Sequence, residues 1–139
     1  MTTLIDSSVL LDLLVDDPHF GGLSETAIRN ARTNGRIVVC EAVIAEIRPA
    51  LSSDKELHDF CEDIGLEYEP CDYIAAVRAG YIYSLYLANK GSAKRVLPDF
   101  LIAAQAVSEG YDLLARDRGY YREYFQDLAL IDPSSASES

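Results

Sequence analysis

The chain has 139 residues, 49% of them apolar, and a net charge of −11, which fits one domain with a single hydrophobic core. No stretch approaches the roughly 18 consecutive apolar residues of a membrane span, and the start M-T-T-L-I-D lacks the basic and apolar regions of a signal peptide. The acidic balance argues against a general coat for nucleic acid, because neutralising phosphates requires a basic face.

Short apolar strands alternate with helical segments along the chain. The predicted strands cover residues 2–6, 36–40, 66–71, 112–115 and 128–131, and the third is expected at a sheet edge because it carries two glutamates. The predicted helices cover residues 8 to about 15, 23–33, 41–51, 56–64, 73–89, 99–109 and 120–125. This alternation predicts an α/β fold with a mostly parallel central sheet between helical layers.

Turn and capping residues delimit these elements. Ser7 or Ser8 is expected to cap the first helix, and Asp72 the long one. Gly65 and Gly110 are expected to end two others. Residues 1–133 are predicted to form a single domain, and residues 134–139, S-S-A-S-E-S, a disordered tail.

Four acidic residues stand in or beside apolar segments, where charge is normally excluded. Asp6 ends T-T-L-I-D and Glu46 lies in V-I-A-E-I, while Asp99 opens D-F-L-I-A-A and Asp117 ends D-L-L-A-R-D. Desolvating a carboxylate is costly unless it is paired or bound to a cation. Asp6 and Asp117 follow strands at their carboxyl ends, where parallel sheets bind ligands. Asp99 lies in the first turn of a helix, whose dipole favours its charge. We therefore expect one shared site.

Carboxylate oxygens suit hard cations such as Mg2+ and Mn2+. Two such ions about 4 Å apart can activate a water and offset charge on a phosphate. The pattern therefore predicts metal-assisted phosphodiester hydrolysis, with Asp6, Glu46, Asp99 and Asp117 as the catalytic residues. Asp6, Asp99 and Asp117 are the expected metal ligands, and Glu46 is expected to act through a second ion or a water. Each acid has a simpler alternative as a helix cap, a first-turn acid, a turn residue or a surface residue.

Other catalytic arrangements have little support in the sequence. His19 lies in a predicted loop and His58 on a polar helix face, so neither is expected to act as a base. Glycine-rich phosphate loops and a nucleophile elbow are absent from the sequence. Glu41, five residues before Glu46, would lie about 140° from it around a helix axis and cannot share its site. The three cysteines lack metal-ligand spacing and are expected to be buried, reduced thiols of a cytoplasmic protein.

Basic and aromatic residues near the acids each have two interpretations. Two basic clusters suit an anionic substrate, although exposed loops often carry such charges. Tyrosines after the fourth acid could stack on bases, while those of the long helix are expected in the core or at a dimer surface. The basic clusters are Lys90, Lys94 and Arg95, and Arg116, Arg118 and Arg122; the tyrosines are Tyr120, Tyr121 and Tyr124, and Tyr81, Tyr83 and Tyr86.

In these segments the chain resembles the PIN-domain ribonucleases, especially the VapC-type toxins of toxin–antitoxin pairs, from about Thr3 to Pro133. L-I-D-S-S-V-L-L-D-L-L is similar to the family's opening strand, aspartate and helix, and V-V-C-E-A-V-I-A-E-I to the segment that presents its glutamate. L-P-D-F-L-I-A-A-Q-A and D-L-L-A-R-D-R-G-Y-Y resemble the third and fourth acidic motifs.

The resemblance implies a PIN-like α/β/α sandwich and an endoribonuclease that cuts RNA with Mg2+ or Mn2+. It also implies a homodimer and a VapB-like antitoxin whose tail fills the acidic groove.

The fourth motif departs from the family's pattern at Ala115, where Thr or Ser is usual. The missing hydroxyl supports an alternative, a PIN-like module that binds RNA or protein with little catalysis. Ser8 could supply a hydroxyl near Asp6, or simply cap its helix. A phosphoacceptor receiver domain is disfavoured, because Asp16 and Asp17 follow a helix rather than the first strand.

Overall fold

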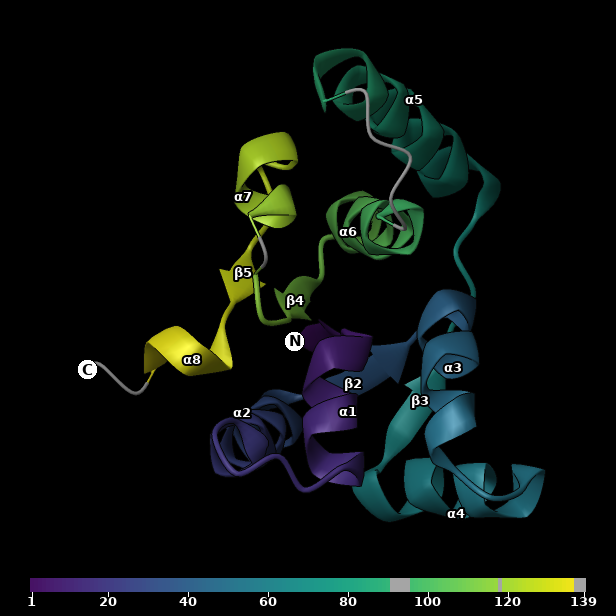
Figure 1. The fold of residues 1–139 in the computed structure, drawn as a ribbon, viewed down its shortest axis with the longest axis vertical. Helices are drawn as coiled ribbons and strands as arrows, with labels where there is room; N and C mark the ends of the chain where they lie inside the picture. Colours follow the sequence, from purple (N-terminus) through teal and green to yellow (C-terminus); the bar gives the residue numbers. More distant parts are fainter. Residues whose placement is uncertain (91–95, 118, 137–139) are drawn as a thin grey trace.

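The structure, a computed structural model, describes residues 1–90, 96–117 and 119–136, which form a central sheet between helices (Figure 1). The strands pair in parallel in the order β3-β2-β1-β4-β5, so β1 is central and β3 lies at an edge, as predicted. The strands span Thr2–Ile5 (β1), Arg36–Val39 (β2), Leu66–Tyr68 (β3), Asp112–Leu114 (β4) and Leu130–Ile131 (β5).

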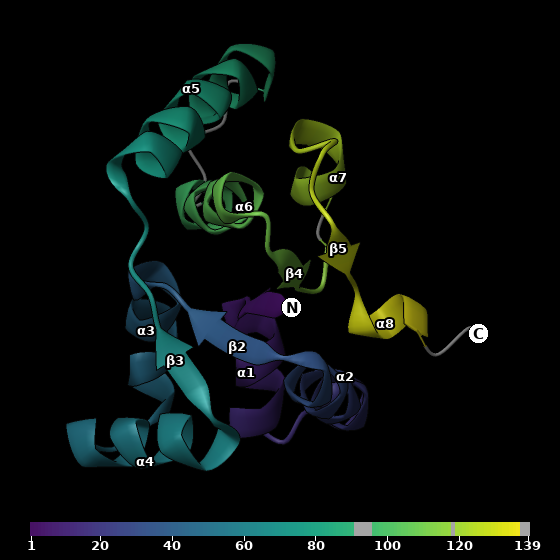
Figure 2. The ribbon, with the colours of Figure 1, turned by 180° about the vertical axis from the view of Figure 1, so that it is seen from behind.

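Helices cover both faces of this sheet. In the front and back views, α5, α6 and α7 lie on one side of it, and α1, α2 and α4 on the other (Figure 1 and Figure 2). The predicted α/β/α sandwich with a short-stranded parallel sheet is confirmed. The helices span Ser7–Leu14 (α1), Gly21–Asn34 (α2), Glu41–Ile47 (α3), Asp54–Ile64 (α4), Tyr73–Lys90 (α5), Leu97–Glu109 (α6), Tyr120–Tyr124 (α7) and Pro133–Ala136 (α8), with a 3-10 turn at Arg48–Ala50.

The direction of the strand connections reverses between β1 and β4. From β1 the chain moves outward to β2 and β3, then returns through α5 and α6 to β4 and finally β5. In open α/β sheets, a crevice for ligands forms outside the carboxyl ends of the strands at such a reversal. The segments after β1 and β4 are therefore the first places to look for a site.

Aliphatic side chains fill the interior on both sides of the sheet. Leu4 and Ile5 of β1, Val38 of β2, and Leu113 and Leu114 of β4 are fully buried. Strands covered on both faces need apolar residues at consecutive positions, which explains the uninterrupted apolar runs of the sequence. Burying each such side chain contributes roughly 1.5–3 kcal/mol to folding.

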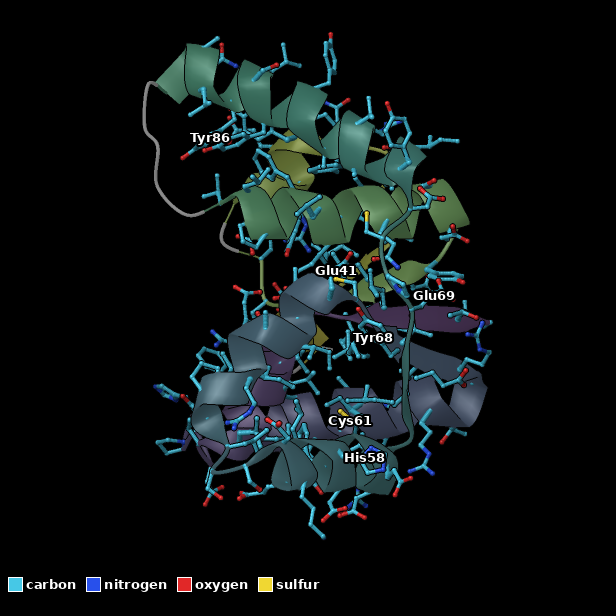
Figure 3. The ribbon with its side chains drawn as sticks, turned by 90° about the vertical axis from the view of Figure 1, so that its right-hand side faces the viewer. Glu41, His58, Cys61, Tyr68, Glu69 and Tyr86 are labelled. Atoms are coloured by element: carbon cyan, nitrogen blue, oxygen red, sulfur yellow. The ribbon has the colours of Figure 1, made fainter. Side chains whose placement is uncertain are left out.

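An aromatic cluster joins α5 to α6 and α7. Tyr86 is buried between α5 and α6 (Figure 3), and its ring packs edge-on against Phe100 and Tyr124 at centroid distances of 5.5 and 5.6 Å. Tyr83 also packs against Phe100. The predicted core position is confirmed for Tyr83 and Tyr86, whereas Tyr81 is exposed. Tyr124 is half-buried in this cluster, and its stacking on bases stays a prediction.

Several element boundaries differ from prediction. Strand β3 ends at Tyr68 rather than at residue 71, and β5 begins at Leu130 rather than at residue 128. Asp6, rather than Ser7 or Ser8, is the N-cap of α1, because its carboxylate accepts the Ser8 N–H. The helix that begins at Glu41 ends earlier than predicted and continues as a 3-10 turn. Pro49 lies in that turn, and a proline lacks the N–H that a continuing α-helix requires.

The end of the chain carries the short helix α8, which contacts α2, where the sequence predicts disorder. The N–H and Oγ of Ser134 donate to Asp132 Oδ1 at 2.9 and 2.6 Å, which anchors its start. Residues 137–139 lie outside the described residues, so the division into domain and tail stays a prediction. Within the described ranges, no helix combines the length and apolarity needed to cross a membrane.

Candidate functional site

Asp6 follows the central strand, and its carboxylate is buried. Oδ2 accepts hydrogen bonds from the N–H and Oγ of Ser8 at 3.2 and 2.5 Å, and Oδ1 accepts one from the Tyr121 hydroxyl at 3.2 Å. The N–H of Asp6 donates to the Leu114 carbonyl at 2.9 Å, which ties the ends of β1 and β4 together. Three donors thus surround this charge at the strand reversal.

The Tyr121 hydroxyl donates to Asp6 and is also subject to the charges of two other predicted acids. Burial raises the pKa of Tyr121 well above its usual value, and the charges of Asp6, Asp99 and Glu46 raise this pKa further. Nearby charges shift a pKa in this way only over short distances. The Tyr121 hydroxyl is therefore hydrogen-bonded to Asp6 and lies near enough to Glu46 and Asp99 for their charges to act on it. Because Tyr121 is only 3% exposed, its proposed stacking on bases is wrong.

Glu46 and Asp99 reach this position from two different helices. Glu46 lies on α3, and its Oε1 accepts a hydrogen bond from Ser7 Oγ at 3.0 Å. Its side chain is more exposed than that of Asp99, which lies in the first turn of α6. The positive end of the α6 dipole favours a negative charge at that point.

Asp117 contributes to the site by a different route. Its Oδ1 accepts the backbone N–H groups of Gly119 and Tyr121 at 2.8 and 3.3 Å, and its Oδ2 lies 3.4 Å from Arg122 Nη1. The Asp117 carboxylate therefore holds the start of α7. It also sets the position of Tyr121, whose hydroxyl reaches Asp6.

Glu41 serves another part of the fold, in agreement with its exclusion by helix geometry. Its Oε1 accepts the Cys71 N–H at 2.9 Å, beyond the end of the edge strand β3. In Figure 3 it lies at the start of α3, near Glu69. The three cysteines are free, as predicted, but their predicted burial is confirmed only for Cys40 and is wrong for Cys61 and Cys71, which are partly exposed. His58 is exposed and pairs with Glu62 on α4.

A buried acid of α1 is missing from the residues that the sequence singled out. Asp12 is 2% exposed and accepts Nε and Nη2 of Arg116 at 2.9 Å each, together with Ser24 Oγ at 2.7 Å. The Arg116 guanidinium also lies 4.2 Å from the centre of the Phe20 ring. Arg116 thus turns inward to pair with Asp12, and the binding of an anionic substrate by the basic clusters stays a prediction. Asp12 lies in L-L-D-L-L, so an acid within an apolar run was the signal that could have found it.

Asp132 is a second acid that sequence reasoning missed. It follows β5, and its Oδ2 accepts the Asp117 N–H at 3.2 Å. Its position at a strand end in L-I-D-P was the available signal. Of the basic residues expected near the site, Lys94, Arg95 and Arg118 lie outside the described residues.

The predicted ligand atoms suit a hard divalent cation, because they are carboxylate oxygens. Ser8 and Tyr121 already donate to Asp6, and Ser7 donates to Glu46. Within the described ranges, no three histidine, cysteine, aspartate or glutamate side chains are grouped closely enough to hold a metal ion. Binding would therefore require the carboxylates to draw together. The metal-binding and catalytic roles of the four predicted acids stay predictions.

The chain matches the family model described as PIN domain over residues 3–125. Its fold is similar to that of VapBC2 from Rickettsia felis, bound to a promoter DNA fragment, with 20% identity, a TM-score of 0.69 and coverage of 95% of this chain and 98% of that chain. It is also similar to a toxin–antitoxin complex from Klebsiella pneumoniae, with 15% identity, a TM-score of 0.70 and coverage of 94% of this chain and 97% of that chain. A third similar structure is FitAcB from Neisseria gonorrhoeae, with 20% identity, a TM-score of 0.66 and coverage of 95% of this chain and 98% of that chain. No curated protein matches the sequence.

At these identities, the solved structures are evidence for the fold alone. The family model carries the assignment, because it spans most of the sequence and its matched range contains Asp6, Glu46, Asp99 and Asp117. The resemblance seen in the four acidic motifs is confirmed at this level: the chain belongs to the PIN-domain family.

Proposed function

We propose that this protein is a metal-dependent endoribonuclease of the VapC type, a toxin that hydrolyses phosphodiester bonds of RNA with Mg2+ or Mn2+. The observation that carries the proposal is the placement of three predicted acids beyond the carboxyl ends of the strands. The Tyr121 hydroxyl donates to Asp6, Ser7 donates to Glu46, and the charges of Glu46 and Asp99 act on the same tyrosine. Membership of the PIN-domain family supports it, as does the likeness in fold to toxin–antitoxin complexes.

The four acids have distinct proposed roles. Asp6, Asp99 and Asp117 would hold the cation, and Glu46 would act through a second ion or a water; all four would be catalytic. A divalent cation supplies a Lewis acid that lowers the pKa of a bound water and offsets charge on the phosphate. The residues around the acids keep the carboxylates oriented, since Ser8 donates to Asp6.

We also propose a homodimer and a VapB-like antitoxin as partners. The similar solved structures include VapBC2 and another toxin–antitoxin complex, which supports a partner of this kind. The net charge of −11 suits a partner with a basic tail. A small upstream reading frame with a DNA-binding start and a basic or aromatic tail is the expected genomic sign. The three free cysteines suit the cytoplasm.

A second candidate function is a PIN-like module that binds RNA or protein with little catalysis. Ala115, fully buried at the end of β4, supports it, because this position lacks the hydroxyl usual in the family. Ser8 favours the enzyme, since its Oγ lies 2.5 Å from Asp6 Oδ2 and provides a hydroxyl in the site.

An RNA-cleavage assay with a Mg2+ and Mn2+ titration separates the two functions. We expect the wild type to cut RNA and Asp99→Asn to be at least about a hundredfold slower, because a neutral amide is a weaker ligand for a hard cation. Asp127→Asn is the matched control: it makes the same change at an exposed acid that pairs with Arg78, and it should keep wild-type activity.

The outcome for the wild type decides between the enzyme and the binding module. If the wild type cuts no RNA at any Mg2+ or Mn2+ concentration but still binds it, the binding module replaces the enzyme. Equal rates for Asp99→Asn and the wild type would remove Asp99 from the site.

A further inference from the structure

A buried ion pair joins the first helix to the segment that follows β4. Asp12 lies one turn beyond Ser8 on α1 and accepts two hydrogen bonds from the Arg116 guanidinium, both at 2.9 Å. A two-pronged pair of this kind fixes the orientation of the guanidinium as well as its distance. Ser24 Oγ donates to the same carboxylate, and the Phe20 ring packs against the guanidinium. Contacts on several sides therefore hold Arg116 in place.

The backbone of Arg116 extends this contact into the acidic site. Its N–H donates to Ser8 Oγ at 3.2 Å, and the Ser8 hydroxyl donates to Asp6 Oδ2 at 2.5 Å. A serine hydroxyl has only one proton. Because Oγ accepts the Arg116 N–H, that proton is directed at Asp6. Oδ2 then accepts both donors of Ser8, and Oδ1 is the oxygen that accepts the Tyr121 hydroxyl.

We propose that the Asp12–Arg116 pair is a positioning device for the acidic site. The pair holds the segment after β4 against α1, so that Ser8 keeps Asp6 turned with Oδ1 toward the Tyr121 hydroxyl. Asp12 and Arg116 are positioning residues, because they act through Ser8 and touch neither substrate nor cation. This inference rests on the proposed function, since the orientation of Asp6 affects chemistry only if Asp6 is a ligand.

The variants must separate positioning from simple stability. Removing one partner of a buried ion pair leaves an uncompensated charge and can unfold the protein, whereas replacing both partners is often tolerated. The informative variant is therefore the double change Asp12→Asn with Arg116→Gln, which keeps the side-chain shapes close and removes both charges. Arg116→Lys serves as the conservative variant, because it keeps a positive charge opposite Asp12.

Two measurements on each variant test the proposal. Mn2+ affinity is measured from the electron paramagnetic resonance signal of the free ion, and exchange of the Arg116 amide hydrogen is measured by NMR. We expect the double variant to bind Mn2+ about tenfold to a hundredfold more weakly, as when partners of metal ligands are lost. We also expect faster exchange at the Arg116 amide. Arg116→Lys should recover most of the affinity.

The matched control is Arg36→Gln, which removes an exposed pair with Glu67 of 3.2 Å at the opposite end of the sheet. It should change neither measurement. Ser8→Ala tests whether Asp12 and Arg116 act on Asp6 through Ser8. Added to the double variant, Ser8→Ala should weaken Mn2+ binding no further, because both changes interrupt the same chain of hydrogen bonds.

Four results would each overturn a part of the proposal. A double variant with wild-type Mn2+ affinity, whatever its melting temperature, would overturn the positioning role, and so would effects of Ser8→Ala that multiply with those of the double variant. A wild type that neither binds Mn2+ nor cuts RNA would overturn the proposed function instead. If the wild type fails in this way, amide hydrogen exchange at residue 116 still tests the ion pair by itself. An exchange rate in the double variant equal to that of the wild type would show that the pair does not hold the segment after β4 against α1.

Discussion

At the scale of single residues, Asp6 and Tyr121 depend on each other. A buried carboxylate must recover the free energy lost with its water shell, and Asp6 does so through Ser8 and the Tyr121 hydroxyl. Tyr121 in turn is buried among negative charges, which favours its protonated form and raises its pKa well above the usual value. Tyr121 therefore remains a neutral hydrogen-bond donor throughout the physiological pH range.

This raised pKa makes the stability of the protein depend on alkaline pH. The folded state keeps the Tyr121 proton at pH values where the unfolded chain, with a tyrosine pKa of about 10, has lost it. The unfolded state then binds fewer protons, so the free energy of unfolding falls as pH rises above about 10. We expect this slope to be steeper for the wild type than for Tyr121→Phe by up to about 1.4 kcal/mol per pH unit. Urea denaturation between about pH 8 and pH 11 measures it.

Tyr81→Phe is the control for this prediction. It removes a tyrosine hydroxyl of the same kind from an exposed position on α5, so it should keep the wild-type slope. Equal slopes for Tyr121→Phe and the wild type would show that the hydroxyl ionises as easily in the folded state as in the unfolded one.

At the scale of elements, the site depends on how strands and short helices are joined at their ends. Asp117 accepts a backbone N–H at the start of α7 and thereby places the Tyr121 hydroxyl within hydrogen-bond distance of Asp6. At the other end of the sheet, the Arg36 N–H donates to the Met1 carbonyl at 3.0 Å, where β1 and β2 begin their pairing. Gly35 precedes this contact, and a Cβ at Gly35 would overlap the Met1 carbonyl oxygen.

Gly35→Ala should therefore weaken the pairing of β1 with β2. The overlap involves backbone atoms, which cannot move aside without shifting the strand, so we expect a loss of about 1–3 kcal/mol in the free energy of unfolding. Gly22→Ala is the matched control, because a Cβ at Gly22, in the first turn of α2, meets nothing within 4 Å. It should be neutral or stabilise by up to about 1 kcal/mol. Urea denaturation compares the two, and equal stability would contradict the proposed overlap.

At the scale of the whole molecule, the net charge of −11 opposes folding through self-repulsion. The repulsion is expected to be strongest where Asp6, Glu46 and Asp99 act on one hydroxyl. If these residues bind a cation in the folded state alone, cation binding and folding must be coupled.

We expect Mn2+ at a hundred times its dissociation constant to add about 2.7 kcal/mol to the free energy of unfolding, and so to raise the melting temperature by several degrees. Asp99→Asn should melt at a higher temperature than the wild type without metal, because it removes one repelling charge, and it should lose most of the response to Mn2+. Differential scanning calorimetry measures both. NaCl at matched ionic strength is the control, and an equal response to NaCl would mean general screening rather than a site.

Much of the architecture follows from the sequence because it depends on local pattern. Apolar runs of a few residues that alternate with amphipathic segments require a parallel sheet covered on both faces. A charge at the end of such a run stands out even in one dimension, which is why Asp6 and Asp117 could be placed at strand ends. Helix geometry alone was enough to separate Glu41 from Glu46.

Only the tertiary structure decided how the charges are shared among partners, because those contacts join residues far apart in the chain. Asp12 meets Arg116 across α1 and the segment after β4, and Tyr121 meets Asp6 across α7 and β1. A local pattern can mark an acid such as Asp12 or Asp6 as unusual, but it does not record which distant residue pairs with it. The sequence determined a PIN-type fold with acids at or near its strand ends, and the packing of α1 and α7 at the ends of β1 and β4 decided which side chains orient them.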